Sequence, residues 1–452
     1  MAMDIESLIT RYDRRVPRYT SYPTAPHFSE AVDGETVSAW LAALPETTGL
    51  SLYLHVPFCR SLCRFCGCHT SAVNTEAPLI SYAAVLRAEI AELAARIGKP
   101  LSVRQIHWGG GTPSILPAAE MIAIHETIVR HFPLAEDAEI AIEIDPRRLP
   151  TDRLAALGSM GVTRASLGVQ DFAADVQDTI GRHQSFAETA RCAEALRGIG
   201  VRSLNLDLVY GLPYQTADGL QATLRQALTL VPDRIAVFGY AHVPWMQRHQ
   251  ALIPEESLPD AKARFWLRDL AETEIGAAGY VAIGLDHFAR PEDGLARAAA
   301  AGKLRRNFQG YTDDDADALI GCGASAISSL PQGYAQNAPR VPAYRAAVSA
   351  GKLATNRGIA LSADDRLRRA AIEQVMCAMR LDLSALCRGH GVAPETLDDA
   401  RPALAELAAL GLIVWEGETL VVPAPARPFL RAVAAAFDRY LETAAKRHAK
   451  AI

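Results

Sequence analysis

The strongest constraint on the fold is an alternation of short β-rich runs with longer helical patterns, from about residue 51 onward. The β-rich runs cover residues 52–56, 105–108, 139–144, 163–169, 203–209, 234–238 and 280–285. The helical stretches cover residues 80–97, 151–157, 186–199, 220–230 and 261–277. Strands that alternate with helices of this length are typical of parallel βαβ units. We therefore predict an α/β fold with a full or partial (β/α) barrel, although a doubly wound open sheet has the same periodicity.

Four cysteines lie within ten residues, directly after the first β-rich run. Cys59, Cys63 and Cys66 have the spacing C-x3-C-x2-C, and Cys68 follows two residues later. Three thiolates this close together suit a [4Fe–4S] cluster, because iron–sulfur clusters are held by cysteine thiolates. The usual ligand set is four, so three thiolates leave one iron open. An open iron can bind a small molecule and pass an electron to it.

Zinc and disulfides are the two alternative uses of these cysteines. A structural zinc site normally needs two separated pairs of ligands. The remaining cysteines stand alone in the sequence, at Cys192, Cys322, Cys377 and Cys387. A chain of 452 residues with 8 cysteines does not have the composition of a disulfide scaffold. The spacing therefore favours the cluster, and a zinc protein would be distinguished by carrying zinc and no iron.

Charge and hydropathy exclude several classes of partner. The formal net charge is −5, which argues against a nucleic-acid-binding surface as the main function. The sequence has no run of 18 apolar residues, so we expect no membrane span. The first ten residues lack the basic-then-apolar pattern of a secretory signal. Together with unpaired cysteines, this predicts a cytoplasmic protein with no nucleic-acid or membrane partner.

Polar or glycine-rich groups recur where the β-rich runs end, which is where parallel barrels place their chemistry. They are Gly109-Gly110-Gly111-Thr112, Glu143, Asp145, Gln170, Asp207, Ala241-His242 and Asp286-His287. The glycine run would let a ligand approach the backbone, or it is only a tight turn, since it lacks the nucleotide-binding pattern G-x-G-x-x-G. Asp207 stands between Leu206 and Leu208, where an acid is costly unless it is paired.

Several motifs resemble a known family. The C-x3-C-x2-C spacing after a first strand is similar to that of radical S-adenosylmethionine (SAM) enzymes. The extended form, with Cys68 and the preceding His55-Val-Pro-Phe-Cys59, resembles the oxygen-independent coproporphyrinogen III oxidases, also called coproporphyrinogen dehydrogenases. Further segments of the same kind are residues 17–24 (Pro-Arg-Tyr-Thr-Ser-Tyr-Pro-Thr), 286–290 (Asp-His-Phe-Ala-Arg) and 306–312 (Arg-Asn-Phe-Gln-Gly-Tyr-Thr). The resemblance extends over nearly the whole chain.

This resemblance implies a reaction and its cofactors. The reaction is anaerobic oxidative decarboxylation of the ring A and B propionates of coproporphyrinogen III, which yields protoporphyrinogen IX in heme biosynthesis. A [4Fe–4S] cluster with bound SAM would supply a 5′-deoxyadenosyl radical for it. The resemblance also implies an electron donor such as flavodoxin or ferredoxin, and a monomeric enzyme.

The resemblance assigns roles residue by residue. Cys59, Cys63 and Cys66 would bind the cluster, and Cys68 would act near the substrate. The cluster-bound SAM would be held by Tyr53, Phe65, Gly110, Glu143 and Ile327. A second SAM would be held by Gly111, Thr112, Gln170, Arg182, Asp207 and Ala241. Two positions depart from the family pattern, namely Tyr214 in place of lysine and Gly239 in place of asparagine.

A second function from a different class is a radical-SAM-like heme-binding chaperone without oxidase activity. Such proteins share the cluster motif and the Gly-Gly-Gly-Thr-Pro run. They lack a cysteine at the position of Cys68 and the Asn-Phe-Gln-Gly-Tyr-Thr segment. This chain has both features, so the oxidase is the preferred interpretation.

The sequence divides into four expected regions. They are an N-terminal arm that covers the active site (1–50), a radical SAM (β/α) barrel (51–290), an extension or lid (291–357) and a smaller, mostly helical, winged-helix-like domain (358–452). Within the last region we expect helices over 363–380, 401–410 and 428–445, and a hairpin from 412–415 and 419–422. A winged helix often binds DNA, but the net charge favours a packing module here.

Overall fold

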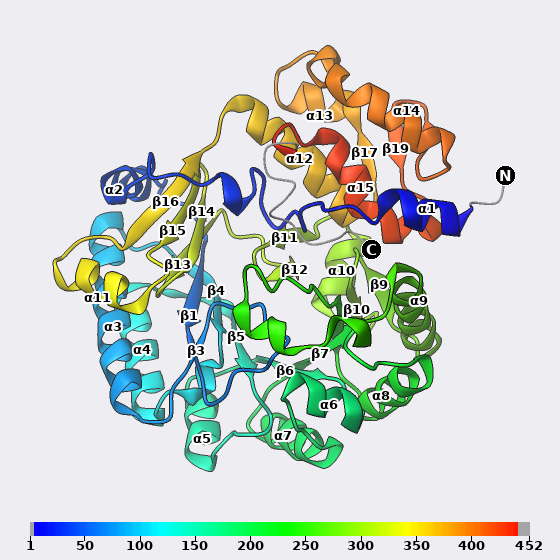
Figure 1. Ribbon diagram of the computed structural model, residues 1–452. Helices are drawn as coiled ribbons and strands as arrows, with labels where there is room; N and C mark the ends of the chain where they lie inside the picture. Colours follow the sequence, from blue (N-terminus) through cyan, green and yellow to red (C-terminus); the bar gives the residue numbers. More distant parts are fainter. Residues whose placement is uncertain (1–3, 442–452) are drawn as a thin grey trace.

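A computed structural model describes residues 4–441. A curved sheet of 12 strands, in the order β16-β15-β14-β13-β1-β4-β5-β6-β7-β8-β10-β9, dominates the molecule (Figure 1). Its central strands are all parallel. They are β13 (Ala318–Cys322), β1 (Leu50–Val56), β4 (Val103–Gly110), β5 (Leu134–Ile144), β6 (Arg164–Gln170), β7 (Ser203–Tyr210) and β8 (Arg234–Gly239). The sheet does not close on itself, which confirms the partial barrel.

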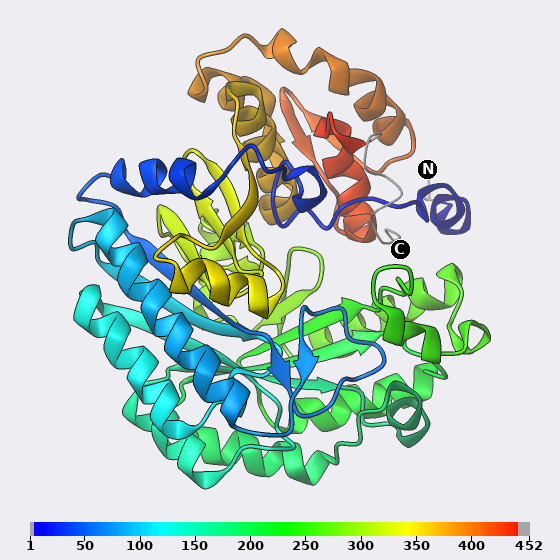
Figure 2. The same cartoon turned by 60° about the vertical axis from the view of Figure 1, so that its left-hand side comes forward.

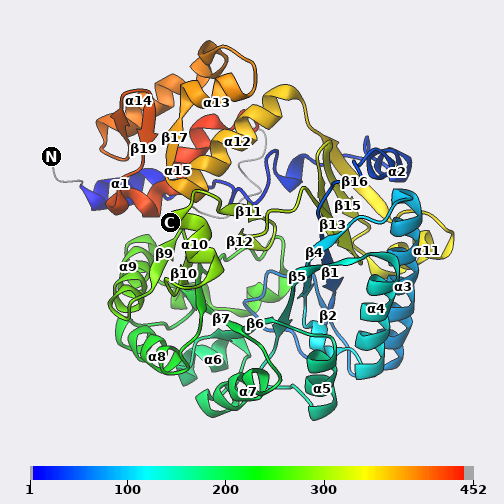
Figure 3. The same ribbon diagram turned by 180° about the vertical axis from the view of Figure 1, so that it is seen from behind.

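Helices cover the outer face of this curved sheet (Figure 3). They are α3 (Ala77–Ile97), α4 (Ala118–His131), α5 (Thr151–Ser159), α6 (Ala174–Ile180), α7 (Phe186–Gly198), α8 (Ala217–Thr229) and α9 (Ala261–Ala277). Local signals fix several of their starts: a capping box of Ser185 and Glu188 begins α7, and Asp260 caps α9. The outward side chains of the strands, such as Leu52, Ile106 and Leu206, are fully buried in the main core with these helices.

The inner, concave face of the sheet carries polar side chains. Because successive strand residues alternate between faces, Ser51, Tyr53 and His55 lie on the face opposite Leu52 and Leu54. Neighbouring strands add further polar groups to this inner side, joined by hydrogen bonds from Gln105 to Glu139 (2.6 Å), Arg164 to Glu139 (2.7 Å) and Ser166 to Asp207 (2.7 Å). The inside of the partial barrel is therefore suited to a polar ligand.

One predicted strand differs from the structure. The run at 280–285 was expected to be a seventh parallel strand, but the chain reverses at residues 284–286. It forms the antiparallel hairpin of β9 (Val281–Ile283) and β10 (His287–Ala289), and β10 pairs antiparallel with β8. This hairpin ends the parallel part of the sheet. Asp286 lies in the turn of the hairpin.

The other edge of the sheet is built from residues far along the chain. Strands β14 (Ile327–Leu330), β15 (Gly333–Asn337) and β16 (Thr355–Ala360) continue antiparallel from β13. Helix α11 (Val341–Ser349) and helix α2 (Gly34–Ala42) pack near this edge (Figure 2). Much of residues 291–357 thus belongs to the main sheet, while the expected domain boundaries stay predictions.

The C-terminal region has its own small core. It contains α12 (Ala363–Ala378), α13 (Leu383–Gly389), α14 (Arg401–Ala409), α15 (Leu430–Ala434) and a three-stranded sheet of β17 (Arg380–Asp382), β19 (Thr419–Val421) and β18 (Val414–Glu416). The expected helix over 428–445 is interrupted: α15 is flanked by 3-10 turns, Leu441 is again α-helical, and residues from 442 lie outside the described part.

The N-terminal arm joins this C-terminal region rather than standing free. Helix α1 (Ile5–Tyr12) buries Leu8, Ile9 and Tyr12 in the C-terminal core (Figure 1). Arg11 and Tyr12 both bind Glu406 of α14, at 2.7 and 3.2 Å. Residues 13–28 then run from the C-terminal region toward the main sheet, so the arm connects these two parts of the protein. Within residues 4–441, the structure contains no helix with the length and apolar character that crossing a membrane requires.

Candidate active site

The cysteine motif lies in a loop at the carboxyl end of β1. Strand β2 (Phe58–Cys59) pairs with β3 (Ser71–Ala72), and residues 60–70 form the loop between them. Neighbouring segments hold the loop by its backbone. The amide of Arg64 donates to the Ile180 carbonyl (2.8 Å), and Gln250 and Gln247 donate to the carbonyls of Phe65 (2.8 Å) and Gly67 (3.0 Å). The loop after β8 therefore positions the cysteine loop.

The thiols in this loop stand in a polar and cationic setting. Cys59 Sγ lies 3.3 Å from Thr70 Oγ1 and 3.5 Å from Thr112 Oγ1, while burial raises the pKa of Cys59. A hydrogen bond with the Cys68 side chain lowers the pKa of Cys66 to about 6 and raises that of Cys68. A thiol with a depressed pKa is available as the thiolate that binds metal.

The donor set fits an iron–sulfur cluster. No three Cys, His, Asp or Glu side chains of residues 4–441 are already gathered around one point as ligands of a single metal ion. A [4Fe–4S] cluster does not require that, because each thiolate binds a different iron. The three loop cysteines provide thiolates of this kind, and guanidinium groups nearby offset their negative charge: Arg182 Nη1 lies 3.7 Å from Cys63 Sγ.

The glycine run, residues 109–111, lies next to the start of this loop. The amides of Gly111 and Thr112 donate to the carbonyls of Val56 (2.9 Å) and Phe58 (2.8 Å), which ties the end of β4 to the start of the cysteine loop. Gly110 has φ +119°, and a Cβ there would lie 2.9 Å from the Val56 carbonyl oxygen. Only glycine suits this backbone, so the sequence Gly-Gly-Gly-Thr has a structural reason at this position.

Tyr53, Gly110 and Glu143 come together beside the glycine run. Glu143 accepts hydrogen bonds from the Gly110 amide and from His107 Nε2, both at 3.2 Å. The Tyr53 hydroxyl lies 3.1 Å from His55 Nδ1, and its ring lies 5.8 Å from that of His107. A carboxylate beside the glycine run is suited to accept hydrogen bonds from a ligand ammonium, which is the role expected for Glu143.

A second group of polar side chains lies on and after the neighbouring strands β6 and β7. Asp207 accepts hydrogen bonds from Ser166 (2.7 Å) and Asn205 (2.8 Å), and burial raises its pKa. Gln170 adopts a left-handed backbone with φ +69° at the end of β6. Arg182 donates to the Gly168 carbonyl at 2.6 Å, while its buried Nε has no partner among the described residues. Both Asp207 and Arg182 therefore retain polar capacity for a ligand.

The remaining predicted residues lie at the margins of the site. Phe65 packs against the cluster of Val176, Ile180, Val209, Leu212 and Tyr240, so it anchors the cysteine loop. The backbone of Ile327 passes close to Gly321, which pairs with Tyr53 across β13 and β1. Ala241 lines a pocket after β8. Of the two departures, Gly239 lines the same pocket, and Tyr214 is exposed on the turn after β7.

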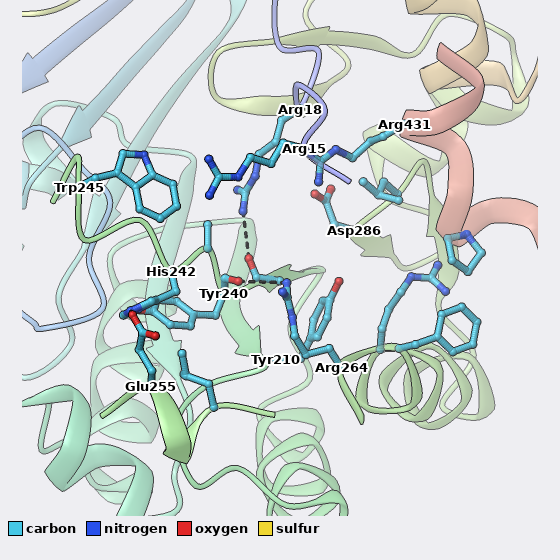
Figure 4. A pocket seen from close by; sticks show the side chains of 17 residues that line it. Arg15, Arg18, Tyr210, Tyr240, His242, Trp245, Glu255, Arg264, Asp286 and Arg431 are labelled. Carbon is cyan, nitrogen blue, oxygen red and sulfur yellow. Dashed lines mark hydrogen bonds and ion pairs between the residues drawn. The ribbon is translucent and has the colours of Figure 1, made fainter. Parts of the chain in front are cut away.

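A group of arginines that was not predicted from the sequence surrounds this pocket (Figure 4). The pocket has a volume of about 390 Å³, and five arginines line it: Arg15, Arg18, Arg264, Arg268 and Arg431. They come from the N-terminal arm, helix α9 and helix α15. Of these segments, only the arm that carries Arg15 and Arg18 was expected from the sequence to cover the active site. No local motif relates the other three, because the fold brings them together from distant segments.

The parallel sheet and the cysteine loop at the end of its first strand define a radical SAM protein, and the sequence model of the Radical SAM superfamily matches residues 53–227. The oxygen-independent coproporphyrinogen III oxidase of Bradyrhizobium diazoefficiens is 46% identical over 97% of this chain and 98% of its own. That of Paracoccus denitrificans is 46% identical over 98% of this chain and 97% of its own. The chain belongs to the family of oxygen-independent coproporphyrinogen III oxidases.

A solved structure agrees with this assignment. The coproporphyrinogen III oxidase (HemN) of Escherichia coli, described as a radical SAM enzyme, superposes with a TM-score of 0.91 at 37% identity. The match covers 98% of this chain and 100% of that chain. The cofactors of the chain are those of its superfamily, a [4Fe–4S] cluster and SAM.

Proposed function

We propose that this protein catalyses the oxygen-independent oxidative decarboxylation of coproporphyrinogen III to protoporphyrinogen IX, a step of heme biosynthesis. The observation that carries the proposal is the C-x3-C-x2-C loop at the carboxyl end of β1, in a chain similar to named oxidases over nearly its full length. The heme-binding chaperone is not favoured, since the relatives reported above bear the oxidase name.

The protein's own part is to bind and orient the reactants and to exclude water. When bound, the cluster and SAM supply the 5′-deoxyadenosyl radical that removes a hydrogen atom from a propionate side chain. Cys59, Cys63 and Cys66 hold the cluster in the loop between β2 and β3. Cys68, the exposed cysteine of that loop, acts near the substrate. Its proximity to Cys66, whose Sγ lies 3.4 Å from the Cys68 amide, supports this assignment.

Two binding sites for SAM follow from the two groups of side chains. Tyr53, Phe65, Gly110, Glu143 and Ile327 hold the cluster-bound SAM, and the carboxylate of Glu143 accepts hydrogen bonds from its ammonium group. Gly111, Thr112, Gln170, Arg182, Asp207 and Ala241 hold a second SAM, with the buried Nε of Arg182 available for a carboxylate. The electron donor is a flavodoxin or ferredoxin, and the enzyme is a cytoplasmic monomer without nucleic-acid or membrane partners.

The proposal is tested with anaerobically purified, iron-loaded protein, SAM, a chemical reductant and coproporphyrinogen III. We expect both 5′-deoxyadenosine and, after oxidation, protoporphyrin. Cys59→Ala should abolish both products, whereas the matched variant Cys387→Ala should keep them, since Cys387 is buried on α13 in the C-terminal core. Deoxyadenosine without protoporphyrin would assign the radical chemistry to another substrate, and tight heme binding without either product would favour the chaperone.

A further inference from the structure

The arginine-lined pocket lies where three parts of the chain meet. Arg15 and Arg18 come from the N-terminal arm, Arg264 and Arg268 from α9, and Arg431 from α15. In Figure 4, Arg15, Arg18 and Arg431 lie on one side of the cavity, opposite Tyr210, Tyr240 and Arg264. The pocket therefore exists only when the arm and the C-terminal region are packed against the barrel.

The charges lining this pocket are unbalanced. Five arginines face two carboxylates, Asp286 and Glu255, and the second of these is exposed and lies 3.6 Å from His242. Arg268 has a partner outside the pocket, Glu272, at 2.7 Å. The hydrogen bond between Asp286 and His287, with the charges of Arg306 and Arg18, lowers the pKa of Asp286 to about 2 despite its burial, so it counts as fully negative. An excess of positive charge remains.

Three of these guanidinium groups have backbone oxygens as their partners, and Arg431 is one of them, since it donates to the Pro17 carbonyl at 2.9 Å and to the Val16 carbonyl. Arg18 donates to the Gly239 carbonyl at 3.0 Å, and Arg264 donates to the Tyr240 carbonyl at 3.1 Å. The Nε of Arg264 is buried with no partner among residues 4–441. Burial lowers the pKa of Arg18 and brings that of Arg431 to about 9. Buried cations of this kind are stabilised by an anion that supplies the missing charge.

The pocket shares a loop with the cysteine site. Residues 240–245 after β8 line it through Tyr240, Ala241, His242 and Trp245. A few residues later, His249 Nε2 lies 2.7 Å from the Cys66 carbonyl, on the loop that carries the cluster ligands. The segment from Tyr240 to His249 therefore contacts both the pocket and the cysteine loop.

We propose that this pocket holds the carboxylates of the tetrapyrrole propionates that do not react, with Arg18, Arg264 and Arg431 as the binding residues. This inference rests on the proposed function and adds the anchoring site for its substrate. Coproporphyrinogen III carries four propionates, and two of them keep their carboxylates throughout the reaction. Arginine binds carboxylates through two parallel hydrogen bonds, which fixes orientation as well as affinity. The anchored pair leaves the other propionates free to reach the cluster site.

The second SAM is another ligand that could place a carboxylate in this pocket, because Ala241, one of the residues expected to hold it, also lines the pocket. Charge argues against it. SAM carries one carboxylate but also an ammonium and a sulfonium group, so it is a net cation. A cavity with an excess of arginine repels a net cation and attracts the tetra-anionic porphyrinogen. The second SAM therefore belongs nearer Asp207 than the arginines.

The test is a binding measurement that needs no turnover. The probe is coproporphyrin III, the air-stable oxidised form of the substrate, titrated into the full-length protein and followed by its fluorescence anisotropy. Its tetramethyl ester, which lacks the charges, and radiolabelled SAM are titrated in parallel. We expect the wild-type protein to bind the free acid at least tenfold more tightly than the ester, with an affinity that falls as salt is added. Equal affinity for acid and ester, or no effect of salt, would overturn the proposal.

Variants locate the anion site. Arg18→Gln and Arg264→Gln should each weaken coproporphyrin binding roughly tenfold or more and leave SAM and ester binding unchanged. Arg264→Lys keeps the charge and should retain more binding than Arg264→Gln, which guards against a folding defect. The matched control Arg104→Gln removes an exposed arginine paired with Asp315 and should bind as wild type. If the pocket variants match the control, or weaken SAM instead, the arginines do not hold the propionates.

The same measurement separates this inference from the proposed function. Arginine-dependent binding of coproporphyrin without protoporphyrin formation would retain the anchoring site and reject the reaction. Protoporphyrin formation with arginine-independent binding would retain the reaction and reject the anchoring site.

Discussion

Arg182 Nη1 lies 3.7 Å from Cys63 Sγ, which places a buried guanidinium beside an expected cluster ligand. Arg182 also lies 3.4 Å from Asp145, and Arg147 binds Asp145 at 2.6 Å. Asp145 and the Gly168 carbonyl thus hold the arginine beside Cys63. A positive charge at this position favours the reduced, more negative form of the cluster.

Replacing this charge should alter the cluster's reduction potential. In Arg182→Gln we expect a shift to more negative values on the order of 100 mV, because the reduced cluster loses a nearby positive charge. An electron paramagnetic resonance titration without SAM measures it. The control Arg104→Gln removes an exposed arginine paired with Asp315, and its shift should be small. An unchanged or raised potential in Arg182→Gln would contradict this role.

The backbone of Gly110 should tolerate no side chain. Gly110→Ala should lower the free energy of unfolding by about 1–3 kcal/mol and weaken SAM binding, because its φ is +119° and its Cβ would approach the Val56 carbonyl to 2.9 Å. Gly161→Ala is the matched control: it shares a positive φ of +71°, but its Cβ meets nothing within 4 Å. Urea unfolding and SAM equilibrium dialysis compare the two. Equal effects would show that backbone strain alone matters.

Gly239, one of the two positions expected to depart from the family pattern, should set the position of Tyr210. A Cβ at residue 239 would lie 2.8 Å from the Tyr210 hydroxyl. Gly239→Ala should therefore displace Tyr210 and lower kcat/KM by roughly tenfold. Because the hydroxyl is the nearest atom, adding Tyr210→Phe should restore part of the activity. A double variant no better than Gly239→Ala would show that the clash is not the cause.

The central strands and the cysteine loop were predictable from the sequence because their signals are local. Apolar runs such as residues 52–56 mark buried parallel strands, and the spacing of Cys59, Cys63 and Cys66 predicts a set of three ligands. Two features were not predictable. Strand β13 pairs with β1 although Tyr53 and Gly321 are far apart in the sequence, and the hairpin of β9 and β10 depends on pairing with β8. The arginine-lined pocket was also not predictable, because only the folded chain brings Arg18, Arg264 and Arg431 together and these residues share no motif.

Buried Glu89 should make the stability depend on pH. Its carboxylate accepts hydrogen bonds from Tyr344 (2.7 Å), Asn337 (2.6 Å) and the Gly323 amide (2.6 Å), where α3 meets the far edge of the sheet. Burial raises its pKa from 4.5 to about 7. The folded state therefore holds this proton more tightly than the unfolded state does, and its contribution to stability is full below pH 4.5 and lost as the pH rises through 7.

This contribution amounts to at most about 3 kcal/mol. Urea unfolding at several pH values between 5 and 8 measures it as the slope of the unfolding free energy against pH. In Glu89→Gln, the part of this slope that comes from Glu89 should disappear. The control Glu126→Gln replaces a glutamate of helix α4 and should keep the wild-type slope. If Glu89→Gln also keeps that slope, Glu89 does not titrate in this range.

The most direct test of the account uses coproporphyrinogen III carrying deuterium on the propionate carbon next to each pyrrole ring. The anaerobic, iron-loaded enzyme is incubated with this substrate, SAM and a reductant, and 5′-deoxyadenosine is analysed by mass spectrometry. We predict that deuterium appears in 5′-deoxyadenosine together with vinyl-bearing product, in the wild-type protein and not in Cys63→Ala. Deoxyadenosine that forms without deuterium, and without any vinyl product, would contradict the assignment of this chain as an oxidase.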